Sequence, residues 1–171
     1  MKLHPVLFCS LFALAACASE KSRDGVASAA TAMSPAEYHR RQQAFADSVL
    51  RAAKPAAAIV EQLGEGYAVG SAALRDTIAA LARQSDCFRT GRRNDPYLAG
   101  AVNIVVNMTR TGADRVQVQE AKWTSKAGDM VNVCLNQAMK GWKLGRVAKF
   151  GGPAGYIVQV QFKSDSLAVV R

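Results

Sequence analysis

Hydrophobic residues recur with two different spacings between Ser71 and Ser166, and the two spacings alternate along the chain. A three-four spacing predicts one amphipathic helix that ends at Gly91 and a second whose apolar stripe reaches Trp142. An alternating spacing predicts two strands joined by a turn after the first helix, and one more strand over residues 155–163. These spacings are carried by Leu74, Ile78, Leu81 and Phe88, by Val102, Ile104, Val106 and Met108, by Val116 and Val118, by Val131, Leu135 and Ala138, and by Tyr156, Val158, Val160 and Phe162.

The order helix, strand, strand, helix, strand predicts the fold class. Strands with one apolar and one polar face, combined with amphipathic helices, form an α+β domain. We expect two helices packed on one face of a three-stranded antiparallel sheet, preceded by a helical N-terminal segment. Polar residues such as Asn103 and Gln159 alternate with the apolar ones, and we expect their face of the sheet to be exposed.

The helical N-terminal segment begins at a clear signal. Ser34, Pro35 and Glu37 match a capping box with proline at the first helical position. Pro55 prevents the helix from continuing beyond about Lys54. A short helix over residues 56–63 and a glycine-containing stretch follow. The chain after the linker is thus divided into a helical and glycine-containing segment, residues 34–70, the α+β domain 71–166 and a tail 167–171.

The first seventeen residues predict an export signal. The apolar run from Val6 to Ala16 is shorter than the roughly 20 residues that a membrane-spanning helix requires. Its end, Leu14-Ala15-Ala16-Cys17, resembles the bacterial lipobox, which is cleaved before the cysteine. In that interpretation residues 1–16 are a lipoprotein signal peptide, and Cys17 carries a diacylglycerol thioether and an N-acyl chain. The alternative is an ordinary secretory signal in which Cys17 has no role.

The lipobox resemblance also implies a location. Ala18 follows the cysteine, and by resemblance to enterobacterial sorting the lack of Asp at this position favours the outer membrane. Residues 17–33 would comprise the lipidated cysteine and an Ala/Ser-rich linker with a root-mean-square reach of about 20–25 Å. We expect a lipid-anchored outer-membrane protein whose domain faces the periplasm.

Cys87 and Cys134 remain for the domain. Both fall on the predicted helices, which we expect to cover the same sheet face, and export to an oxidising compartment favours a disulfide between them. Closing a loop of roughly 48 residues would stabilise the domain by about 4 kcal/mol on the chain-entropy estimate. A redox pair and two unpaired thiols are the alternatives, although a redox pair would favour C-x-x-C spacing.

A set of short motifs resembles the AgmX/PglI C-terminal domain over about residues 73 to 165. The motifs are Asp86-Cys87-Phe88, Gly100-Ala101-Val102-Asn103-Ile104, Thr111-Gly112, Val131-x-x-Cys134-Leu135, Gly141-Trp142 and Val158-Gln159-Val160-Gln161-Phe162. That family is similar to the TonB C-terminal fold and occurs in envelope proteins of gliding and predatory bacteria. The resemblance implies a TonB-like α+β domain and a disulfide, and it implies no enzymatic activity.

Composition narrows the function classes further. With 171 residues, half of them hydrophobic and one fifth charged, the chain excludes a large multi-domain enzyme and a polytopic membrane protein. After removal of the signal, His39 is the only histidine, which excludes most histidine-dependent triads and two-histidine metal sites. The carboxylates lie scattered without recognisable catalytic spacing. We therefore expect neither enzymatic activity nor a cofactor nor a metal.

Charge suggests a binding function instead. The formal net charge is +9, and residues 71–166 contain fourteen Lys or Arg against seven Asp or Glu. Basic residues gather after each predicted helix, and we take Arg92, Arg93, Lys143 and Arg146 as candidate binding residues for lipopolysaccharide or peptidoglycan anions. Stabilisation of the helix dipoles is the structural alternative. Nucleic acid is not expected as a partner of an exported lipoprotein.

The last predicted strand offers a second binding mode. We expect residues 155–163 to form a sheet edge to which a partner adds a strand, with Gln159, Gln161 and Lys163 on its exposed face. Folding back of the tail, Leu167 to Val170, would instead cover this edge. The sequence thus predicts a non-enzymatic adaptor or subunit of an envelope complex for gliding or transport. A structural tether to anionic cell-wall or lipopolysaccharide groups is the alternative function.

Overall fold

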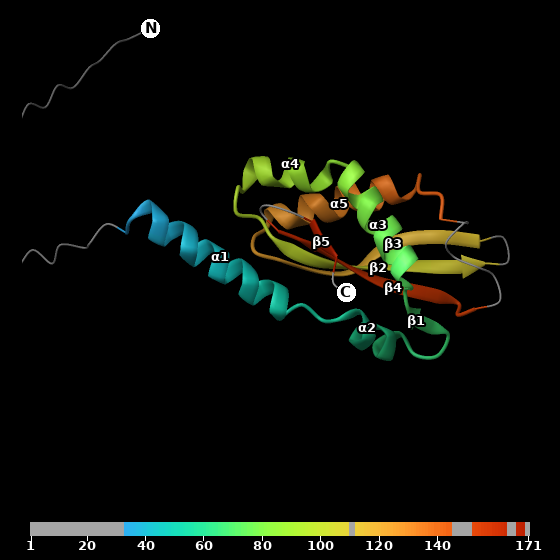
Figure 1. Ribbon diagram of the computed structural model, residues 1–171. Coiled ribbons are helices and arrows are strands. Elements are labelled where there is room, and N and C mark those ends of the chain that lie inside the picture. The colour runs from blue at the N-terminus through green and yellow to red at the C-terminus, as the bar shows by residue number, and fades with distance from the viewer. Residues whose placement is uncertain (1–32, 110–111, 145–151, 164–166, 170–171) are drawn as a thin grey trace, which may run out of the picture. The chain divides into compact units, whose positions relative to one another are not determined.

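Three long strands and two short ones form a mixed sheet in the computed structural model, which describes residues 33–109, 112–144, 152–163 and 167–169 (Figure 1). β2 (Gly100–Thr109) pairs antiparallel with β3 (Gly112–Trp123) on one side and with β4 (Gly155–Phe162) on the other. β1 (Tyr67–Val69) pairs parallel with the first residues of β4, and β5 (Leu167–Val169) pairs antiparallel with its last residues. The α+β class is confirmed, but the expected purely antiparallel three-stranded sheet is wrong, because β1 and β5 extend it.

Three helices cover the apolar face of the sheet: α3 (Ala72–Gln84), α4 (Cys87–Asn94) and α5 (Ala127–Met139). The helix expected to end at Gly91 is therefore two helices, separated where Asp86 adopts a left-handed conformation with φ of 58°. Gly91 lies inside α4, where a side chain would collide with Val131 and Leu98. Its role is close packing of α4 against α5 rather than helix termination. The residues at the centre of this core are Leu74, Ile78, Val102, Ile104, Val106, Val131, Leu135, Val158, Val160 and Phe162.

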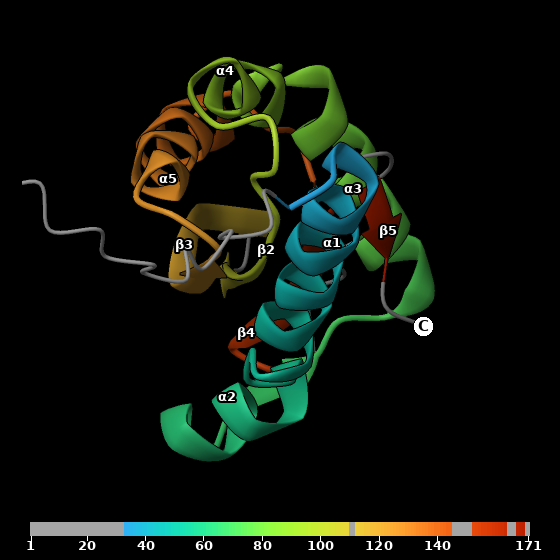
Figure 2. The same ribbon diagram turned by 90° about the vertical axis from the view of Figure 1, so that its left-hand side faces the viewer.

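Two further helices, α1 (Pro35–Arg51) and α2 (Ala56–Leu63), cover the opposite face (Figures 1 and 2). The predicted cap is present, since the Ser34 hydroxyl oxygen accepts a hydrogen bond of 3.2 Å from the Glu37 amide. Ile59 of α2 packs on Val105 and Ile157 in a small second core. The helical segment 34–70 is thus part of the same fold as the α+β domain, and it also supplies β1.

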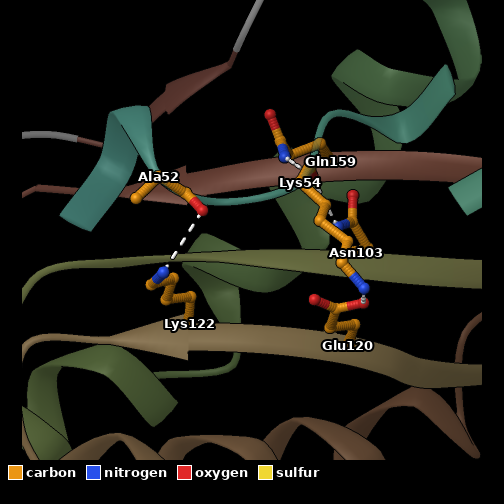
Figure 3. Close-up of polar contacts among 6 residues, drawn as sticks. All are labelled: Ala52, Lys54, Asn103, Glu120, Lys122 and Gln159. Carbon is orange, nitrogen blue, oxygen red and sulfur yellow. Dashed lines mark hydrogen bonds and ion pairs between the residues drawn. The ribbon is translucent and has the colours of Figure 1, made fainter. Parts of the chain in front are cut away.

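The prediction that the polar face is exposed is wrong. Asn103 and Gln159 are only 3% and 8% exposed. Both donate to the backbone carbonyl of Lys54, over 2.9 Å from Asn103 Nδ2 and 2.6 Å from Gln159 Nε2 (Figure 3). We call residues 52–55, which link α1 to α2, the connector. Polar side chains become buried here because the connector supplies a carbonyl that they can bind.

Two lysines add contacts between the connector and the sheet (Figure 3). Lys54 Nζ lies 3.2 Å from Glu120 Oε2 of β3, and Lys122 Nζ donates to the Ala52 carbonyl over 3.3 Å. The side chains of Lys54 and Glu120 remain 47% and 38% exposed, so solvent screens their ion pair strongly. The connector is therefore fixed mainly by the buried amides of Asn103 and Gln159.

Candidate functional site

β4 is not the free sheet edge that the sequence suggested. β2 pairs along one side of it, while β1 and β5 pair with successive parts of the other side. Gln159 is buried under the connector, and Gln161 and Lys163 are only half-buried at the end of the strand. The alternative in which the tail folds back describes the observed arrangement. Gln159, Gln161 and Lys163 therefore do not lie on a free edge to which a partner could add a strand.

The outer side of β3 is open instead, because no described strand pairs with it. A groove of about 640 Å³ follows this edge where it passes the C-terminal end of α5. We call it the β3 groove, and its lining is Ala113–Val118, Asn136, Met139, Lys140 and Trp142. This edge therefore combines strand backbone that no described strand pairs with and the apolar and basic side chains of the groove.

One position on the β3 edge is already occupied. The Val118 amide donates to Asn136 Oδ1 of α5 over 2.9 Å, so this amide points away from β2. Backbone direction alternates along a strand, and Val118 and Val116 are paired in unbroken register with Ile104 and Val106. The Val116 amide consequently points outward too. Irregular register on either side, at Asn103/Ile104 and Asn107/Met108, limits the regular part of the edge.

The Cys87–Cys134 disulfide is confirmed, with an S–S distance of 2.03 Å and a Cα–Cα distance of 5.5 Å. It joins the first residue of α4 to the middle of α5, so α4 is held against the domain. A groove of about 580 Å³ lies over the disulfide between the two helices, and its residues include Met130 and Val133. Those two side chains are 51% and 72% exposed.

Arg92 and Arg93 contribute to a different cavity, of about 490 Å³, between the end of α3 and the outer face of α4. Arg83 of α3 and Arg89 of α4 complete a set of four arginine residues that line it. We call it the arginine cavity, and its remaining lining is Ala82, Asp86, Phe88 and Pro96. Arg83 could not be assigned to this set from the sequence, because only the turn at Asp86 brings α3 beside α4.

Lys143 does not share this cavity, and Arg146 lies outside the described residues. α4 and α5 run antiparallel, since Cys87 bonds to Cys134 while Asn94 Nδ2 contacts Met130 Sδ at 3.6 Å. Lys143 follows the far end of α5, about 20 Å along that 13-residue helix at 1.5 Å per residue. Arg92 and Arg93 therefore do not form one anion site with Lys143.

His39 takes part in an aromatic cluster with Tyr38 and Tyr97. Its Nδ1 lies 2.9 Å from the Tyr97 hydroxyl oxygen, and the Tyr38 ring packs edge-on against the Tyr97 ring at 5.5 Å. These contacts attach the beginning of α1 to the loop after α4. Among the described residues, no three His, Cys, Asp or Glu side chains gather to hold a metal ion.

Cys17, the predicted signal peptide 1–16 and residues 18–32 of the predicted linker lie outside the described residues. Of the helices that the structure does describe, none has the length and apolar character to cross a membrane. Comparison of the chain with protein-family models, curated proteins and solved structures finds no match. The functional assignment therefore depends on the residues and geometry given above.

Proposed function

We propose that this protein is a non-enzymatic envelope lipoprotein, anchored through Cys17 to the outer membrane, that presents a protein-interaction domain to the periplasm. The resemblance of its motifs to the AgmX/PglI C-terminal domain supports an adaptor or subunit role in an envelope complex for gliding or transport. The observation that carries the proposal is the outer edge of β3, with which none of the described strands pairs. An extended segment of a partner adds a strand to this edge and places side chains in the β3 groove.

The Val116 amide gives a specific test of strand addition. Proline at position 116 removes an outward-pointing N–H without removing a hydrogen bond between β2 and β3. Val116→Ala is the matched control, because it trims the same half-buried side chain and keeps the N–H. We expect Val116→Pro to reduce partner recovery at least tenfold and Val116→Ala to leave it within threefold, with both variants folded by circular dichroism. Equal recovery with both variants would exclude pairing at Val116.

The partner itself can be identified by crosslinking in cells. A photo-crosslinker at the exposed Arg115, which lines the β3 groove, should capture a discrete envelope protein. The same group at the exposed Glu61 of α2 serves as the control position. Capture should be lost when Cys17→Ser prevents lipidation. Identical adducts from both positions would indicate contact by proximity alone and would count against the β3 edge.

A structural tether to anionic cell-wall or lipopolysaccharide groups is a second candidate function. The arrangement of Arg83, Arg89, Arg92 and Arg93 around one cavity favours it. Sedimentation with purified sacculi or lipopolysaccharide should then fall with rising salt, and it should fall further in Arg92→Gln/Arg93→Gln than in Lys143→Gln. Sedimentation that is insensitive to both salt and these substitutions would remove this candidate.

A further inference from the structure

We propose that the arginine cavity is a binding site for a phosphate group. The inference deepens the tether candidate by naming the group that is recognised, and it relies on that candidate only for the biological source of the phosphate. Arg89, Arg92 and Arg93 are spaced three and four residues apart and so share one face of α4. Arg83 faces the same cavity from the last turn of α3.

The charge of the cavity is unbalanced. Three arginines of α4, Arg89, Arg92 and Arg93, line it against one carboxylate among the described residues, that of Asp86. Asp86 Oδ2 accepts a hydrogen bond of 2.6 Å from Arg89 Nη2. No described carboxylate lies within ion-pair distance of Arg92 or Arg93. The cavity thus retains an excess of positive charge for a ligand.

Two of the guanidinium groups are held by contacts that leave other donors available. Arg89 uses Nη2 toward Asp86, and Arg92 uses Nε toward the Pro96 carbonyl over 3.4 Å. Each guanidinium has five N–H donors, so neither contact exhausts it. Asp86 can hold Arg89 at the corner of α3 and α4 because its left-handed backbone turns the chain there.

The cavity also has a rigid support. Phe88, one of the lining residues, packs against Phe162 and Trp123 of the core with ring centroids 5.1 and 6.4 Å away. The disulfide at Cys87 fixes the start of α4, and the close approach at Gly91 fixes its middle. With the backbone of α4 fixed in this way, binding has to order only the arginine side chains.

Phosphate fits this donor set better than a carboxylate does. A phosphate presents three or four oxygens and can accept from several guanidinium groups at once, whereas two carboxylate oxygens suit one fork. The cavity volume of about 490 Å³ leaves room for a second phosphate or for the group that carries the first. Ala82, Phe88 and Pro96 offer apolar contact to that group.

The position of the cavity suggests where the phosphate comes from. Tyr38 and His39 of α1 pack on Tyr97, which follows the cavity residue Pro96. The start of α1 therefore lies beside the cavity lining. In a protein anchored at Cys17, the predicted linker of about 20–25 Å places this end of the domain within reach of phosphorylated headgroups.

The first test is titration of the full lipidated chain in non-ionic detergent with inorganic pyrophosphate, at fixed ionic strength, by calorimetry. We expect saturable binding that Arg92→Gln/Arg93→Gln weakens at least tenfold. Arg40→Gln/Arg51→Gln removes the same charge from exposed positions of α1 outside the cavity and should change affinity less than twofold. Thermal unfolding of both double variants checks that they fold. Equal weakening by the two pairs would show dependence on net charge alone and would overturn the site.

Competing ligands test the chemistry and the source. Succinate at the same ionic strength should not displace pyrophosphate, and displacement at similar concentration would overturn the preference for phosphate. Displacement by glycerophosphoglycerol would support the site with a phospholipid source, and displacement by glucosamine 1-phosphate would support it with a phosphorylated sugar source. Displacement by neither would overturn the proposed recognition of phosphorylated headgroups. Pyrophosphate binding that persists without sedimentation on sacculi or lipopolysaccharide would remove the tether function and leave the site.

Discussion

On one face of the sheet, α3, α4 and α5 bury a continuous apolar core that a disulfide crosslinks. On the other face, α2 buries a small group around Ile59, α1 buries Val49 and Leu50, and amide side chains bind the connector. The first face is stabilised by apolar burial, which is not directional. The second face is stabilised mainly by hydrogen bonds, which require a particular direction between donor and acceptor. The spacing of hydrophobic residues therefore predicts the helix-covered core, whereas no sequence spacing predicts the hydrogen bonds to the connector.

The disulfide gives the largest expected difference between the faces. Cys87→Ser/Cys134→Ser should lower the free energy of unfolding by about 4 kcal/mol, because the crosslink closes a long loop in the unfolded chain. Urea denaturation of oxidised wild type, reduced wild type and the double variant measures it. The reduced wild type should resemble the variant. A loss below about 1 kcal/mol in both would mean that packing of α4 on α5 is sufficient without the bond.

Features of the fold that depend on local sequence could be predicted, and features that depend on tertiary contacts could not. Ser34, Pro55 and the short helix at residues 56–63 were identified because caps and prolines act locally. The division of the first domain helix at Asp86 was missed, because only the tertiary fold imposes a left-handed backbone there. β1 has three residues, too few for alternation to be visible.

The candidate sites show a similar limit. Arg92 and Arg93 could be proposed because they are adjacent in the sequence, but their partner Arg83 comes from another helix. The prediction that β4 is a free edge was wrong, because whether a strand lies at an edge depends on all the strands of the sheet, including the short β1 and β5. The outward N–H groups of β3 were equally invisible, since register and bulges decide their direction.

A double-mutant cycle at the connector probes the directional face. Asn103→Leu alone should cost less than about 1 kcal/mol, because Gln159 still donates to the Lys54 carbonyl. Asn103 Oδ1 also has no hydrogen-bond partner among the described residues, so leucine removes an unsatisfied buried atom. Gln159→Leu alone should likewise be mild. Together they leave the carbonyl without a donor, and we expect about 1–3 kcal/mol beyond the sum of the single losses.

Urea denaturation of the four proteins gives the coupling energy, and hydrogen exchange at the start of α2 reports whether the connector loosens. Asn107→Leu is a useful control, since this half-buried asparagine lies on the same strand face and binds Tyr67 rather than Lys54. Strict additivity of Asn103→Leu and Gln159→Leu would show that the connector does not depend on sharing one carbonyl.

The smallest effect belongs to the Lys54–Glu120 ion pair, which tests whether charge rather than amide donation attaches the connector. Glu120→Gln should cost about 0.2–1 kcal/mol at low salt, because both side chains are well exposed, and the loss should shrink at high salt. Denaturation of Glu120→Gln, Lys54→Gln and the double variant at two salt concentrations separates the pair from each charge. A salt-independent loss above about 1.5 kcal/mol would contradict the assignment. The ion pair would then attach the connector more strongly than the buried amides of Asn103 and Gln159 do.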